Sequence, residues 1–86
     1  MPFSAELSLY PLANNYIEVI QAFIDRLNEY PDLTVLTNTM STQVFGELEV
    51  VMGALTKELK WLYDRVPSQV LVCKFINKDL TPDHVK

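Results

Sequence analysis

The chain has little of several residue types that carry chemistry in small proteins. It contains one cysteine, one histidine and two glycines in 86 residues. The single cysteine, Cys73, cannot form an internal disulfide and suits a reducing compartment. No Gly-rich phosphate loop, nucleophile elbow or paired metal-ligand spacing is present. We therefore expect no catalytic residue, no metal site and no cofactor.

Basic charge and long apolar runs are also scarce. Seven Lys and Arg residues face eleven Asp and Glu residues, for a formal net charge of −4. An acidic chain repels phosphate backbones and anionic membranes, which disfavours nucleic-acid and membrane-surface binding. No stretch approaches the roughly 20 apolar residues of a membrane span, and the N-terminus does not read as a signal peptide. The expected location is therefore cytoplasmic.

Hydrophobic residues make up 49% of the chain, enough for one packed core with apolar surface to spare. Alternating residues predict a first strand over Phe3–Leu12. Helical spacing predicts a helix over Tyr16–Tyr30, whose apolar stripe is Tyr16, Ile17, Ile20, Phe23, Ile24 and Leu27. The core-facing positions of this strand are Phe3, Ala5, Leu7 and Leu9. The opposite positions are Ser4, Glu6, Ser8 and Tyr10.

The second half of the chain predicts a hairpin, a helix and a last strand. Leu33–Thr39 and Thr42–Phe45 are expected to pair around Met40 and Ser41, and Gly46 is expected to break the strand. A second amphipathic helix is predicted over Glu47–Val66, closed by Pro67. Residues 69–76 form the last strand, with Leu71, Cys73 and Phe75 on one side and Val70, Val72 and Lys74 on the other.

This β-α-β-β-α-β order predicts an α+β, ferredoxin-like architecture. Two right-handed crossovers place both helices on one face of a four-stranded antiparallel sheet. We expect a single domain over residues 1–80 and a frayed tail over 81–86, which contains His84. The sheet face turned away from the helices, here called the open face, carries Ser4, Glu6, Ser8 and Tyr10.

Three features each allow a plain and a functional interpretation. The polar open face is either an ordinary solvated surface or a platform for a ligand, on which Tyr10 could stack against a flat ring. Trp61 is expected on the side of the second helix that points away from the sheet, as a single exposed aromatic or a partner contact. Cys73 alternates with Leu71 and Phe75, so it is expected to be a small core residue. The alternative, a nucleophilic thiol, is disfavoured because no basic partner lies near it in sequence.

Three segments together resemble a known family. They are Ala5-Glu6-Leu7-Ser8-Leu9-Tyr10-Pro11-Leu12, then Thr37-Asn38-Thr39-Met40-Ser41-Thr42, then Val44-Phe45-Gly46-Glu47. Their order and spacing resemble the YkoF-like domains that bind thiamine or hydroxymethylpyrimidine, including single-domain thiamine-binding proteins. The resemblance extends over about residues 4 to 77.

The resemblance implies non-catalytic binding of thiamine or its pyrimidine moiety by a homodimer or homotetramer assembled through its sheets. It assigns ligand contacts to Ser8 and Tyr10 on the first strand and to Ser41 and Thr42 on the hairpin. Asn38 could meet the polar edge of the pyrimidine, and Glu6 and Tyr10 could meet the cationic thiazolium. Ser8 and Thr42 are both expected to point toward the open face.

A second interpretation of the chain needs no ligand. In it, Tyr10, Val70 and Val72 form a seam through which the open face packs against another copy. A cavity beside Ser8 and Thr42 would favour the ligand, and its absence would favour the assembly module.

Overall fold

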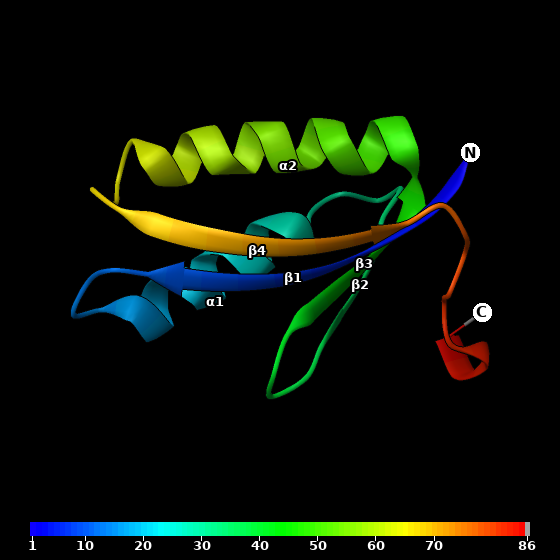
Figure 1. The fold of residues 1–86 in the computed structure, drawn as a ribbon, viewed down its shortest axis with the longest axis horizontal. Helices are drawn as coiled ribbons and strands as arrows, with labels where there is room; N and C mark the ends of the chain where they lie inside the picture. The colour runs from blue at the N-terminus through cyan, green and yellow to red at the C-terminus, as the bar shows by residue number, and fades with distance from the viewer. Residues whose placement is uncertain (86) are drawn as a thin grey trace.

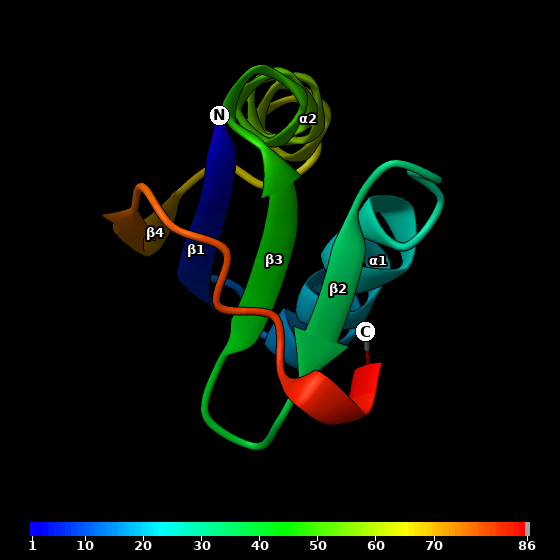
Figure 2. The ribbon, with the colours of Figure 1, turned by 90° about the vertical axis from the view of Figure 1, so that its right-hand side faces the viewer.

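The chain folds into a four-stranded antiparallel sheet with two helices on one face (Figures 1 and 2). This computed structural model describes residues 1–85. The strand order is β2-β3-β1-β4, which confirms the expected ferredoxin-like architecture. Its elements are β1 (Pro2–Pro11), α1 (Tyr16–Leu27), β2 (Thr34–Thr37), β3 (Thr42–Glu47), α2 (Leu48–Tyr63), β4 (Gln69–Ile76) and a 3-10 turn at Asp83–Val85.

The predicted elements all exist, and the main differences lie at their ends. Both helices are shorter than predicted, because hydrogen-bonded turns replace helix after Leu27 and Tyr63. The expectation that Gly46 breaks its strand is wrong. Gly46 lies inside β3, opposite Phe3 in the ladder to β1. Within residues 1–85, neither α1 nor α2 could span a lipid bilayer.

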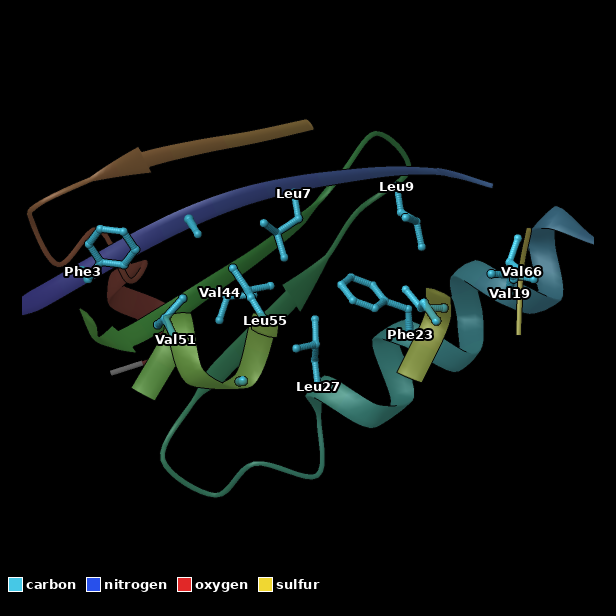
Figure 3. Packing of buried hydrophobic residues seen from close by; sticks show 13 residues of the cluster. Phe3, Leu7, Leu9, Val19, Phe23, Leu27, Val44, Val51, Leu55 and Val66 are labelled. Atoms are coloured by element: carbon cyan, nitrogen blue, oxygen red, sulfur yellow. The ribbon is translucent and has the colours of Figure 1, made fainter. Parts of the chain in front are cut away.

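The core lies between the helices and the inward face of the two central strands (Figure 3). All four residues predicted for the inward face of β1 are buried, and Leu7 is only 2% exposed. They pack against Phe23 and Leu27 of α1 and against α2. Alternation along β1 was therefore a correct guide to the buried face.

The outer strand β4 lies beyond the cover of the helices, which pack mainly on β1 and β3 (Figure 2). Cys73 is exposed, so its assignment to the core is wrong. Phe75 also stays 48% exposed, although its ring lies 5.3 Å from that of Phe3. Partial desolvation raises the pKa of the Cys73 thiol, which keeps it protonated at neutral pH.

The residues after β4 cross one end of the open face (Figure 2). The Ser4 hydroxyl donates a hydrogen bond to the Lys78 carbonyl at 2.7 Å and accepts one from the Leu80 amide at 2.9 Å. Ser4 is only 4% exposed as a result. The open face is thus covered near Ser4 and uncovered around Ser8 and Tyr10. Lys86 lies outside the described residues, and fraying of residues 81–86 stays a prediction.

A polar cluster joins the two helices where the sequence indicated only an amphipathic face. Glu58 of α2 is 2% exposed and accepts hydrogen bonds from the Arg26 guanidinium and from the Tyr30 hydroxyl, the latter at 2.6 Å. Trp61 lies between the guanidinium groups of Arg26 and Arg65, at 4.3 and 4.4 Å from its ring centroid. Trp61 is therefore half-buried against the core, and its predicted position away from the sheet as a lone aromatic is wrong.

Candidate functional site

The strand β1 continues past the point where its neighbour β3 has turned away. The β1–β3 ladder runs from Pro2 opposite Glu47 to Leu7 opposite Thr42. On its other side, β1 stays paired with β4 as far as Pro11 opposite Gln69. The last four residues of β1 therefore have a strand on one side only, and the loop between β2 and β3 diverges from them (Figure 1).

A cavity of about 460 Å³ fills this gap, and we call it the β1 notch. Its walls are residues 7–12 at the end of β1, residues 37–42 of the hairpin and four side chains of α1. Five of the six residues proposed for the site from sequence line it, namely Ser8, Tyr10, Asn38, Ser41 and Thr42. The notch thus brings together residues that lie about 30 positions apart in the chain.

The notch passes through the plane of the sheet. Ser8 is half-buried and Tyr10 is exposed, both on the open face as predicted. Thr42 lies opposite Leu7, and directly opposed residues in an antiparallel pair share a face. Thr42 is only 6% exposed and points toward the helices. Its predicted orientation toward the open face is therefore wrong, because the pairing of β3 with β1 places Thr42 on the same face as Leu7 and Val44.

The hairpin tip is held in shape by Asn38. Its side-chain Oδ1 accepts hydrogen bonds from the backbone amides of Met40 at 2.8 Å and Ser41 at 2.9 Å. The backbone amide of Asn38 donates to the Ser41 carbonyl at 3.0 Å. Such an Asx turn is a common use of asparagine. The Oδ1 acceptor is therefore occupied, and Nδ2 is the group that Asn38 can offer to a ligand.

Glu6 lies beside the notch and lines a neighbouring hollow of about 390 Å³. Its Oε2 accepts a hydrogen bond from the Ser41 hydroxyl at 3.1 Å, and its Oε1 lies 3.6 Å from the Lys74 ammonium. In the sheet, Glu6 is flanked by Gln43 of β3 and Lys74 of β4. Ser41, in the wall of the notch, is therefore hydrogen-bonded to the Glu6 carboxylate of the neighbouring hollow.

Sequence reasoning missed the α1 wall of the notch, formed by Tyr16, Ile20, Phe23 and Ile24. These residues were assigned to the apolar stripe of the helix, which is correct but incomplete. One signal could have indicated this wall: Tyr16 is a large aromatic residue at the start of the stripe, and in the structure it remains half-exposed. The wall could not be placed without the crossing of α1 under the end of β1.

Comparison with known proteins identifies the fold. No family model matches the sequence, and no curated protein matches it. A Thermotoga maritima protein proposed to serve thiamine biosynthesis or salvage superposes with a TM-score of 0.85 at 18% identity, over 99% of this chain and 95% of that one. A Streptococcus pneumoniae protein reaches 0.84 at 21% identity, over 99% and 96%. A domain of unknown function from Bacillus cereus reaches 0.79 at 17% identity, over 98% and 86%.

All three share the ferredoxin-like fold. At these identities the likeness shows the fold alone, and the thiamine connection is a property of the Thermotoga maritima protein.

The chemistry available in the notch follows from its lining. Among the described residues, those that line the notch include no Asp, Glu, His, Cys, Lys or Arg. The lining combines hydroxyls and an amide with aromatic and aliphatic walls, a mixture typical of small-molecule pockets. Residues 1–85 also contain no group of three His, Cys, Asp or Glu side chains that could hold a metal ion.

Proposed function

We propose that this protein reversibly binds thiamine or its hydroxymethylpyrimidine moiety in the β1 notch, as a YkoF-like domain, and does so without catalysis. The observation that carries the proposal is the notch itself, which gathers Ser8, Tyr10, Asn38, Ser41 and Thr42 around one cavity. The thiamine connection of the Thermotoga maritima protein of the same fold supports it. The presence of a cavity beside Ser8 and Thr42 favours a ligand over the assembly module that needs none.

The polarity of the site matches the two rings of thiamine. An aminopyrimidine is flat and neutral, and the uncharged notch offers it hydroxyl and amide partners between apolar walls. The thiazolium is a cation, which Tyr10 could receive at the rim and Glu6 could balance. Lys74 is 80% exposed, so its ion pair with Glu6 is weak and open to competition from a cationic ligand.

Binding without catalysis is part of the proposal. A general acid, a base or an activated nucleophile must lie within hydrogen-bond reach of the reacting atoms. Within residues 1–85 the notch lining has no carboxylate, imidazole, ammonium or thiol, and the raised pKa of Cys73 makes that thiol a weak nucleophile. A role in buffering or delivering the ligand fits such a site.

A thermal-shift series tests the ligand. Thiamine, its phosphates and hydroxymethylpyrimidine are each titrated to millimolar concentration. A tenfold excess over Kd stabilises the folded state by about 1.4 kcal/mol. For a domain of this size we expect the melting temperature to rise by roughly 5–10 °C. Unchanged melting temperatures with every compound would contradict the proposal.

The matched variants are Ser8→Ala and Thr56→Ala. The Ser8 hydroxyl lines the notch, and loss of one neutral hydrogen bond should raise Kd several-fold while the fold survives. Thr56 lies on the exposed side of α2, so its variant should bind like the parent. Equal binding by both variants would remove Ser8 from the site.

We also propose that the protein is a homodimer or homotetramer, with β4 as a contact edge. β4 is a long outer strand whose Val70 and Val72 are half-exposed on the open face. Long apolar edges with free backbone groups invite pairing with a second chain, and a two-fold dimer is the commonest closed solution. Trp61, held between two arginines at the helix interface, lies outside this contact.

Light scattering at micromolar concentration measures the assembly. We expect a mass of two or four times 9.9 kDa for the parent. The variant Cys73→Pro removes an amide that points away from β1 and should shift the protein toward the monomer while circular dichroism stays unchanged. A parent mass near 9.9 kDa would contradict the proposed assembly.

A further inference from the structure

The hydrogen-bond alternation along β1 assigns a direction to each of its backbone groups. The Leu12 amide donates to the Ser68 carbonyl at 3.0 Å, one position past the end of the β4 ladder. Bonded and non-bonded pairs alternate in an antiparallel ladder. The even-numbered residues of β1 therefore direct their N–H and C=O groups to β4. The odd-numbered ones point to the β3 side, in agreement with the bond from the Leu48 amide to the Met1 carbonyl at 3.0 Å.

Leu9 lies opposite Leu71 of β4 but has no partner on the β3 side, to which its backbone groups point. The β3 ladder ends at Leu7 opposite Thr42, so Leu9 would continue it opposite Met40. The Met40 amide instead donates to Asn38 Oδ1. Leu9 lines the notch, so its N–H and C=O point to the gap from which the hairpin has turned away. Buried backbone groups of this kind are paired in the great majority of cases, by protein, water or a ligand.

From this geometry we infer that the backbone N–H and C=O of Leu9 bind the ligand in the notch. They hydrogen-bond to a ring edge that carries an acceptor next to a donor. This inference rests on the proposed function and names the part of the ligand that is read. An aminopyrimidine has such an edge, in which a ring nitrogen accepts from the Leu9 N–H and the adjacent amino group donates to the Leu9 C=O. The ring then takes the position of the missing residue of β3.

The length of the free edge favours a single ring over a peptide strand. On one side, Leu7 already uses its N–H and C=O with Thr42. On the other side, Pro11 has no N–H to donate. Only one donor remains, so an added strand would gain one residue pair. A heterocycle with one donor–acceptor edge would have that edge fully satisfied.

The first test of this inference varies the ligand. It compares hydroxymethylpyrimidine with an analogue in which hydrogen replaces the ring amino group. Isothermal titration measures both Kd values. The analogue leaves the Leu9 carbonyl without a partner, so we expect about tenfold weaker binding. Equal affinities would overturn the inference while leaving the proposed function intact. Absence of binding by hydroxymethylpyrimidine and thiamine alike would overturn the proposed function and the inference with it.

The second test replaces one backbone amide by an ester and keeps the side chain. The ester at Leu9 removes the N–H that has no partner on the β3 side, so it should weaken hydroxymethylpyrimidine binding by about tenfold. The ester at Ala5, which does not line the notch, is the matched control. Both esters weaken the preceding carbonyl as an acceptor, but only the Ala5 ester also loses a ladder bond to Val44. We expect the Ala5 ester to melt lower than the Leu9 ester and to bind like the parent.

Amide hydrogen exchange gives an independent readout on the parent. Saturating hydroxymethylpyrimidine should slow exchange at Leu9 and shift its amide proton resonance, with much smaller changes at Leu7. Ligand binding with an unaltered Leu9 amide, or a Leu9 ester that binds as tightly as the parent, would show that the ring is read by side chains alone.

Discussion

Replacing Glu58 by alanine is expected to lower the free energy of unfolding by about 3 kcal/mol. The Glu58 carboxylate is almost fully buried and accepts hydrogen bonds from Arg26 and Tyr30 of the neighbouring segment. Removing one partner of a buried ion pair typically costs about 3–5 kcal/mol. The low end applies here, because the Arg26 side chain is 30% exposed and keeps water as a partner. Urea denaturation at pH 7 measures the change.

The same carboxylate makes stability depend on pH. Burial raises the pKa of Glu58, but the hydrogen bonds from Tyr30 and Arg26 and the charge of Arg26 outweigh it, so the pKa lies below the ordinary 4.5. A lowered pKa contributes stability above pH 4.5 that is lost as the pH falls through the folded value. Burial and the Glu58 hydrogen bond raise the pKa of Tyr30 to about 12 from 10.0, so its contribution is complete below pH 10 and fades above it.

The control for Glu58→Ala is Glu29→Ala. Glu29 is exposed, and surface substitutions of this kind usually change stability by less than about 0.5 kcal/mol. Between pH 7 and pH 4, the Glu58 variant should lose less stability than the parent, since the acid-sensitive carboxylate is gone. Similar denaturation midpoints for the two variants at pH 7 would show that the buried cluster contributes little.

A pair of glycine substitutions should move stability in opposite directions. At Gly46, an added Cβ would lie 2.8 Å from the Leu33 Cδ2 and 3.2 Å from the Asp32 carbonyl oxygen. Overpacking of this kind costs about 1–3 kcal/mol. At Gly53, on the exposed side of α2, a Cβ meets nothing within 4 Å. Gly53→Ala should therefore stabilise the protein by about 0.5–1 kcal/mol through helix propensity.

Thermal unfolding of Gly46→Ala, Gly53→Ala and the parent measures both changes in stability. For a domain of this size, the melting temperature shifts by about 4–8 °C per kcal/mol. If Gly46→Ala melts at or above the parent temperature, the approach of the 32–33 loop to β3 is looser than the contact distances indicate. If Gly53→Ala melts lower, that helix face is covered in solution, as an assembly contact would do.

Much of the fold could be read from the chain because its local patterns agree with one another. The alternation of β1 separated Leu7 and Leu9 from Ser8 and Tyr10 correctly. The helical spacing placed Phe23 and Leu27 in the core. The order of elements then allowed few topologies, since crossovers in such sheets are right-handed. Burial was predicted wrongly at Cys73 and Trp61, where it depends on how the helices pack over the sheet and against each other.

The candidate site was predicted in part. Five of the six residues line one cavity, but only three-dimensional pairing shows that β1 runs on after β3 has turned away. The face of Thr42 is set by its pairing with Leu7 of β1, a strand more than 30 residues away in the chain. The burial of Glu58 was not predicted, because its partner Arg26 lies 32 residues away and no local pattern encodes that contact.

By itself, the sequence determined the element types, the buried face of β1 and the absence of a catalytic motif, because each depends on neighbouring residues and their periodicity. The tertiary structure alone decided the notch, the free backbone edge of Leu9, the buried Glu58 and the exposure of β4. Those features arise where elements distant in sequence meet or fail to meet. Strand lengths, register and helix crossing set such meetings, and they are properties of the packed whole.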